Sequence, residues 1–141
     1  MFFGEYEYRI DEKGRAPLPP KFRAAFADGI VLVPGAEKCI LAYTPSEWKE
    51  LAGDLTTSPL PTSKMRKLSR ALFASAFELS LDAQGRIAIP ATLRQHAGIT
   101  ADVIVAGNNA YLELWDKKTW QREKAESLAQ AWQTIETLEK R

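Results

Sequence analysis

An internal repeat is the feature that most constrains the fold of this chain. Residues 6–23 and 77–94 match position by position without a gap. Both copies carry the same residue at these pairs: Glu7/Glu78, Asp11/Asp82, Gly14/Gly85, Arg15/Arg86, Pro19/Pro90 and Arg23/Arg94. Apolar residues replace one another at Tyr6/Phe77, Tyr8/Leu79, Ile10/Leu81, Ala16/Ile87, Leu18/Ile89 and Phe22/Leu93. The pattern predicts a duplicated supersecondary unit.

The two copies extend beyond this central match. Residues 31–35 correspond to 103–107, and residues 43–48 correspond to 115–120. We therefore expect four consecutive parts. They are a first repeat at 5–52, a linker with a basic amphipathic helix at 53–75, a second repeat at 76–120 and a C-terminal helix at 117–141.

Each repeat begins with a pattern typical of a β-strand followed by a turn. Polar and apolar residues alternate at 5–10 and at 77–81, which predicts strands with one buried face. Both strands lead into an Asp-x-x-Gly-Arg sequence. There the Asp side chain can accept backbone amides, and the Gly can adopt a positive φ. A second strand is expected to follow, with Arg15 and Arg86 on the face opposite its buried residues.

Helices are expected next in each repeat. Pro19 and Pro20, and Pro90 in the second repeat, mark the start of short helices, because proline is favoured in the first turn. Two further strands are expected at 30–33 and 39–43, matched by 103–105 and 111–115. A helix should then begin after Thr44, which is suited to cap it.

The segment between the repeats carries an excess of basic residues. Four of them accompany apolar residues at helical spacing: Lys64, Arg66, Lys67 and Arg70 beside Met65, Leu68 and Leu72. This helix could present a solvated face or contact nucleic acid or a partner. The preceding stretch at 51–63 is rich in Gly, Pro, Ser and Thr and is predicted to be a flexible joint.

The C-terminal segment breaks the symmetry of the repeats. Its predicted helix carries an apolar stripe formed by Trp120, Leu128, Ala131, Trp132, Ile135 and Leu138. A single helix cannot bury such a stripe. It should therefore pack on the body, on the basic helix or on a neighbouring subunit.

Composition excludes several classes of protein. With 141 residues, of which 45% are hydrophobic, the chain can form one compact unit. One cysteine and one histidine leave no disulfide framework and no zinc cluster, so we expect no metal and no cofactor. The N-terminus lacks a signal-peptide pattern, and no apolar run is long enough to span a membrane, so a cytoplasmic protein is expected. Motifs for a catalytic nucleophile, a phosphate loop or a small-molecule substrate are missing, so we do not expect an enzyme.

The order of these motifs resembles that of the MraZ family of bacterial proteins. The resemblance rests on the paired turns, on the helices that follow them with Arg23 or Arg94, and on the run from Gly107 to Asp116. It implies an α+β fold of two tandem AbrB-like (SpoVT-AbrB) swapped-hairpin repeats. These would form one small double-psi-like β-barrel unit with peripheral helices and a long C-terminal helix.

The same resemblance implies a function. MraZ proteins are transcription regulators of the division and cell-wall gene cluster, and they bind short direct repeats in DNA upstream of their own gene. They assemble as homo-oligomeric rings, so the expected partners are double-stranded DNA and further copies of the chain, in the cytoplasm at the nucleoid. A ring-forming structural or protein-interaction module without specific DNA binding is the main alternative.

The resemblance also assigns roles to individual residues. It implies DNA contact by Arg15 and Arg86, and we also expect DNA contact from Lys13, Gly14 and Gly85 in the same turns. Turn-shaping or supporting roles are expected from Asp11, Asp82, Arg23 and Arg94. An exposed Arg on a rigid turn can bind a guanine edge or a phosphate. The residues alone leave a second interpretation open, in which each arginine pairs with the aspartate of its own turn merely to fix that turn.

Overall fold

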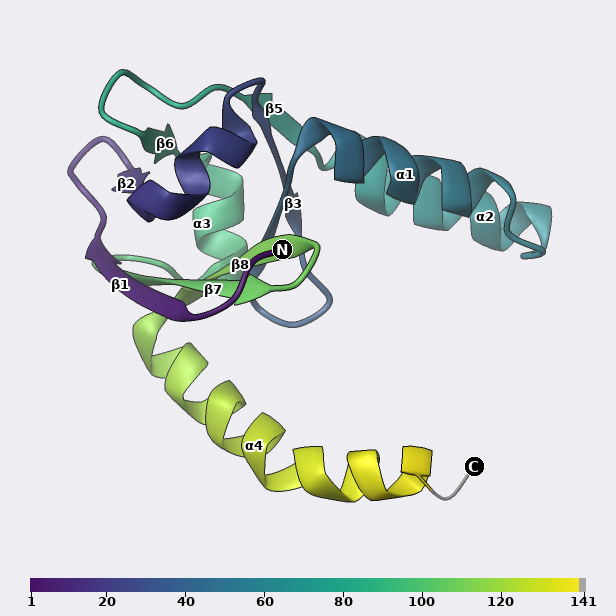
Figure 1. The fold of residues 1–141 in the computed structure, drawn as a ribbon. Coiled ribbons are helices and arrows are strands. Elements are labelled where there is room, and N and C mark those ends of the chain that lie inside the picture. The colour runs from purple at the N-terminus through teal and green to yellow at the C-terminus, as the bar shows by residue number, and fades with distance from the viewer. Residues whose placement is uncertain (140–141) are drawn as a thin grey trace.

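Strands from the two repeats are interleaved in one six-stranded antiparallel sheet of order β1-β7-β8-β4-β3-β5. The computed structural model describes residues 1–139 (Figure 1). The strands are β1 (Glu5–Arg9), β3 (Ile30–Pro34), β4 (Ile40–Tyr43), β5 (Phe77–Leu79), β7 (Asp102–Asn108) and β8 (Tyr111–Asp116). β1 pairs with β7, and β5 pairs with β3. The first strand of each repeat therefore lies beside a strand of the other repeat.

A second, two-stranded sheet joins the repeats again. It pairs β2 (Arg15–Pro17) antiparallel with β6 (Arg86–Ala88), and Ala16 lies opposite Ile87. Each of these strands leads into a short helix, η1 (Pro20–Phe26) or α3 (Ala91–Ala97). η1 is a 3-10 helix, whereas α3 is α-helical and ends at Gly98, whose φ is 67°. The predicted strand, turn, strand and helix order is thus present in both repeats.

The hydrophobic core lies between the large sheet, the β2–β6 ribbon and the two short helices. Ala16 and Ile87 from the ribbon are 2% and 1% exposed, and Phe22 and Leu93 from the helices are 5% and 3% exposed. These are equivalent positions of the sequence repeat, so each repeat contributes a matching set of side chains to one shared core. Full burial of each larger apolar side chain contributes about 1.5–3 kcal/mol.

Helix α1 (Pro45–Thr56) begins as the sequence predicts. The Thr44 side chain accepts a hydrogen bond from the Glu47 amide at 3.2 Å, and the Tyr43 and Trp48 rings lie 5.6 Å apart. The second repeat uses the same arrangement, because Trp115 and Trp120 lie 5.8 Å apart. These aromatic residues therefore fix the direction in which each helix leaves the sheet.

The predicted flexible joint at 51–63 is largely helical, which corrects that expectation. α1 continues to Thr56, and α2 (Thr62–Ser69) follows after a short connection and continues into the π-helical turn η2 (Arg70–Ala74). Gly53 weakens a helix by only about 0.5–1 kcal/mol relative to Ala, and its neighbours are helix-forming residues. α1 and α2 form a hairpin that extends sideways from the body (Figure 1).

Helix α4 (Lys117–Glu139) follows β8 directly. Its first part packs near β7 and β8, and its second part extends away from the body (Figure 1). The last two positions of the predicted 117–141 helix lie outside the described residues. Despite its length, α4 is too polar to cross a membrane, and the same holds for the other helices within 1–139.

Candidate nucleic-acid interface

Two nearly identical turns connect β1 to β2 and β5 to β6. In the first turn, Asp11 Oδ1 accepts the amides of Lys13 and Arg15 at 2.9 and 2.8 Å, and Asp11 Oδ2 accepts Arg15 Nε at 2.7 Å. The second turn repeats this arrangement. Asp82 Oδ1 accepts the amides of Gln84 and Arg86, both at 2.9 Å, and its Oδ2 accepts Arg86 Nε at 2.8 Å.

Glycine closes each turn. The amide of Gly14 donates to the Asp11 carbonyl, and the amide of Gly85 donates to the Asp82 carbonyl, both at 3.0 Å. The φ angles are +76° at Gly14 and +74° at Gly85, in the left-handed region that favours glycine. The repeated Asp and Gly are therefore required by the geometry of the turn.

The carboxylates of both turns are held in the charged form. The pKa of Asp11 lies below its usual value, first because of the hydrogen bond from the Arg15 amide and then because of the Arg15 side chain. The pKa of Asp82 is lowered in the same way by the amide and side chain of Arg86. Both carboxylates stay ionised at neutral pH, where they orient the two guanidinium groups.

The β2–β6 ribbon places the two turns side by side (Figure 1). The Leu18 amide donates to the Gly85 carbonyl at 3.0 Å, and the Ile89 amide donates to the Gly14 carbonyl at 2.9 Å. Arg86 Nη1 also lies 3.8 Å from Asp11 Oδ2. The arginines of two segments far apart in the sequence thus form one cluster.

Pairing with aspartate leaves both arginines with free hydrogen-bonding capacity. The side chains of Arg15 and Arg86 remain 31% and 27% exposed. A guanidinium has five N–H donors, and the hydrogen bond to the aspartate of the same turn uses only Nε. The two interpretations of these residues are therefore compatible, because the same aspartate that fixes the turn also orients the arginine.

Arg23 and Arg94 support the turns across the repeats. Arg23 Nε donates to the Leu18 carbonyl, and Arg94 Nε donates to the Ile89 carbonyl, both at 3.0 Å. Each guanidinium lies beneath the turn of the other repeat. Arg94 is so close to Gly14 that an added Cβ would be 2.9 Å from Arg94 Cζ. Arg23 is as close to Gly85, where an added Cβ would collide with it. The sequence indicated support by these arginines but did not predict that it crosses between repeats.

The surface around the arginines is polar and shallow. Lys13 is exposed, and Asp11, Glu12, Lys13 and Arg15 line a hollow of about 220 Å³. Across residues 1–139, His, Cys, Asp and Glu side chains do not gather in any group of three or more that could hold a metal. The lining of this hollow is balanced in charge, with two acidic and two basic residues, so the groups that could bind an anion are the Lys13 ammonium and the N–H groups of Arg15 that do not bond to Asp11.

Comparison with known proteins identifies the family. The model of the MraZ protein, a family described as antitoxin-like, matches residues 1–71 and again residues 72–138. A protein of Dehalococcoides mccartyi named "Transcriptional regulator MraZ" is 59% identical over 140 residues, which cover 99% of both chains. Proteins with the same name from Herpetosiphon aurantiacus and Thermoanaerobacter pseudethanolicus are 45% and 43% identical over 121 residues, which cover 86% of this chain and 85% of each relative. With one match in each half and relatives aligned over nearly its whole length, this chain belongs to the MraZ family.

Proposed function

We propose that this chain is a transcription regulator that binds double-stranded DNA through its two turns. The observation that carries the proposal is the side-by-side placement of Arg15 and Arg86 on matching turns. The relatives described above are named transcriptional regulators rather than enzymes, which supports a regulatory role.

Arg15 and Arg86 would read base edges. Each guanidinium is oriented by a carboxylate, so little side-chain freedom would be lost on contact. A bidentate contact between arginine and guanine contributes about 1–3 kcal/mol of discrimination against a wrong base. Lys13, which is exposed in the first turn, would add a phosphate contact. Gly14 and Gly85 are buried against Arg94 and Arg23, so they would shape the turns rather than contact DNA themselves.

One protomer would bind weakly, because the net charge of the chain is only +1. We propose that homo-oligomeric rings present the two turns several times along short direct repeats. The second and later contacts then gain from a high effective concentration. Subunits related by rotation suit direct repeats, whereas a two-fold dimer would favour a palindrome.

The proposed target is the promoter region upstream of the chain's own gene, in the division and cell-wall gene cluster. The protein would then act in the cytoplasm at the nucleoid. This target is what the resemblance to the MraZ family implies, and the names of the relatives support a regulatory role without naming a target.

A structural ring without specific DNA binding is the second candidate. It is favoured by the exposed apolar residues of α4, which suit contacts between proteins. The two candidates differ in the predicted response to DNA sequence and to salt.

Fluorescence anisotropy separates these candidates. The full-length protein would be titrated onto labelled DNA from upstream of its gene and onto a scrambled duplex of equal length and composition, over a series of salt concentrations. We expect tighter binding to the upstream DNA, with an affinity that falls steeply as salt rises. Equal or absent binding on both duplexes would refute the regulator proposal.

A further inference from the structure

Two separate apolar surfaces are left uncovered by the rest of residues 1–139. The first is the tail stripe, defined as Leu128, Ala131, Trp132, Ile135 and Leu138 on α4. Leu128, Trp132 and Leu138 are 60%, 72% and 59% exposed. Exposure of a Trp and several aliphatic residues along one helix face is typical of a protein interface.

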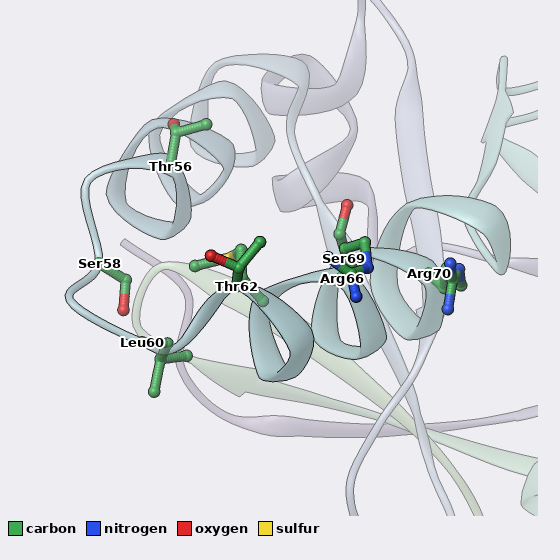
Figure 2. A pocket seen from close by; sticks show the side chains of 8 residues that line it. Thr56, Ser58, Leu60, Thr62, Arg66, Ser69 and Arg70 are labelled. Carbon is green, nitrogen blue, oxygen red and sulfur yellow. The ribbon is translucent and has the colours of Figure 1, made fainter.

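The second surface is the hairpin groove between α1 and α2. It has a volume of about 320 Å³ and is lined mainly by apolar atoms of Ala52, Leu55, Thr56, Met65, Ser69 and Phe73. It adjoins a hollow of about 410 Å³ that includes Leu60, Arg66 and Arg70 (Figure 2). Leu60 and Phe73 are 42% and 39% exposed, so this surface is also open.

We propose that the tail stripe of one copy docks in the hairpin groove of a second copy. The proposal deepens the proposed function, because it names the contact that would build the oligomer. Both surfaces are exposed in the same copy, so they do not cover each other within one chain. Their lengths correspond: the stripe from Leu128 to Leu138 spans about 15 Å, and the groove side of the hairpin from Met65 to Phe73 spans about 12 Å.

The distribution of charge favours contact between the tail stripe and the hairpin groove over contact between two tails. Between Asp54 and Glu78 the chain has four basic residues and no acidic ones: Lys64, Arg66, Lys67 and Arg70. Along the tail stripe the charged residues are acidic, Glu126, Glu136 and Glu139, and with Lys140 and Arg141 at the end of the sequence residues 125–141 carry a net charge of −1. Contact between tail and hairpin therefore brings a weakly acidic segment to a segment of charge +4, whereas contact between two tails gains no such attraction.

The proposed contact is head-to-tail. Each copy would use its tail toward one neighbour and its hairpin toward the other, and such contacts close into a ring when the rotation between copies permits. The hairpin groove and the tail stripe would then set the spacing between successive pairs of turns.

Site-directed cross-linking tests the contact in the full-length protein. Ser69→Cys places a thiol in the hairpin groove, and Ala131→Cys places one on the tail stripe with little change in volume. The native Cys39 is fully buried, which raises the pKa of its thiol to about 12, so it should not react. Tagged and untagged single variants would be produced together in one cell and treated with a short bismaleimide.

We expect a cross-linked product that contains one tagged and one untagged chain. The matched control pairs Ser69→Cys with Gln130→Cys, which lies on the side of α4 away from the stripe. The control should give several-fold less product. Equal product from the control, or no product from either pair, would overturn the proposal, and a product from Ala131→Cys alone would show that two tails pair instead.

A charge exchange provides an independent check. Arg66→Glu/Arg70→Glu and Glu136→Lys/Glu139→Lys should each shift the protein toward smaller species in analytical ultracentrifugation. A chain carrying all four changes should regain the larger assembly, and circular dichroism would confirm that each variant is folded. Failure of the combined variant to recover would count against tail-to-hairpin contact.

These measurements use no DNA, so their result is separable from the proposed function. Sequence-dependent DNA binding without tail-to-hairpin cross-links would reject only the proposed interface. Cross-links without sequence-dependent binding would leave the interface standing and support a structural ring.

Discussion

The guanidinium group of Arg23, in the first repeat, lies directly beneath Gly85, in the turn of the second repeat. Arg94 occupies the equivalent place beneath Gly14 in the turn of the first repeat. Each turn is therefore supported by a residue from the other half of the chain. The two arginine-bearing turns should consequently behave as one structural unit.

Replacement of Gly85 by alanine should destabilise the protein by about 2–4 kcal/mol. A left-handed backbone costs alanine about 1–2 kcal/mol, and the new methyl group would also displace Arg23 from its hydrogen bond to the Leu18 carbonyl. Urea denaturation measures the change. Gly98→Ala is the matched control, because Gly98 also has a left-handed backbone, with a φ of 67°, but a Cβ there meets no atom within 4 Å. It should destabilise the protein only by the backbone cost of about 1–2 kcal/mol, and equal losses from the two variants would contradict the support of this turn by Arg23.

Truncation of Arg94 should disturb the turn of the other repeat. In Arg94→Ala, the largest changes in amide chemical shift beyond the mutated helix are expected at Lys13, Gly14 and Arg15, because Arg94 lies against Gly14. Arg23→Ala should instead affect Gln84, Gly85 and Arg86. Two-dimensional NMR spectra of the two variants would show that each substitution affects the turn of the other repeat. Changes confined to the turn of the mutated repeat would contradict the cross-repeat support.

The repeat in the sequence was sufficient to predict most local structure. Asp11 and Gly14, with Asp82 and Gly85, indicated the turns, and Thr44 with its aromatic neighbours indicated the start of α1. These features depend on residues a few positions apart, whose hydrogen bonds and packing are largely local. Local patterns therefore carried the prediction of strands, turns and caps.

The interleaving of the repeats was not predictable from the same patterns. Tyr8 pairs with Val103, and Ile30 pairs with Leu79, and nothing in a local pattern selects such distant partners. The support that Arg23 and Arg94 each give to the turn of the other repeat depends on this interleaving. The Gly, Pro, Ser and Thr content of 51–63 predicts a joint, but most of these residues follow α1, and Gly53 within it costs the helix only about 0.5–1 kcal/mol relative to Ala.

Acid should weaken the folded state through the aspartates of the turns. The pKa values of Asp11 and Asp82 are lowered from 3.8 by the amides and side chains of Arg15 and Arg86. Their stabilising contribution is therefore present above pH 3.8 and is lost as pH falls through the lower pKa of the folded state.

The variant Asp11→Asn/Asp82→Asn isolates this contribution. It should be less stable than the native chain at neutral pH, and the difference should shrink as pH falls below 3.8. The midpoint of urea denaturation, followed for both proteins over that pH range, tests the expectation. A difference that stays constant with pH would show that the aspartates do not stabilise the fold through their charge.

Two double variants that lose the same charge distinguish sequence reading by the turns from general electrostatic attraction to DNA. Arg15→Ala/Arg86→Ala and Lys38→Ala/Lys118→Ala each remove two positive charges, but only the first changes the turns, and Lys38 and Lys118 are exposed. Since bidentate contacts discriminate by about 1–3 kcal/mol each, the arginine variant should lose most of its preference for upstream DNA.

The most direct test is therefore the ratio of affinities for upstream and scrambled DNA, measured by fluorescence anisotropy at one salt concentration for the native chain and both double variants. We expect a high ratio for the native chain and the lysine variant, and a ratio near unity for a folded arginine variant. A high ratio retained by the arginine variant would contradict the claim that the paired turns read DNA sequence.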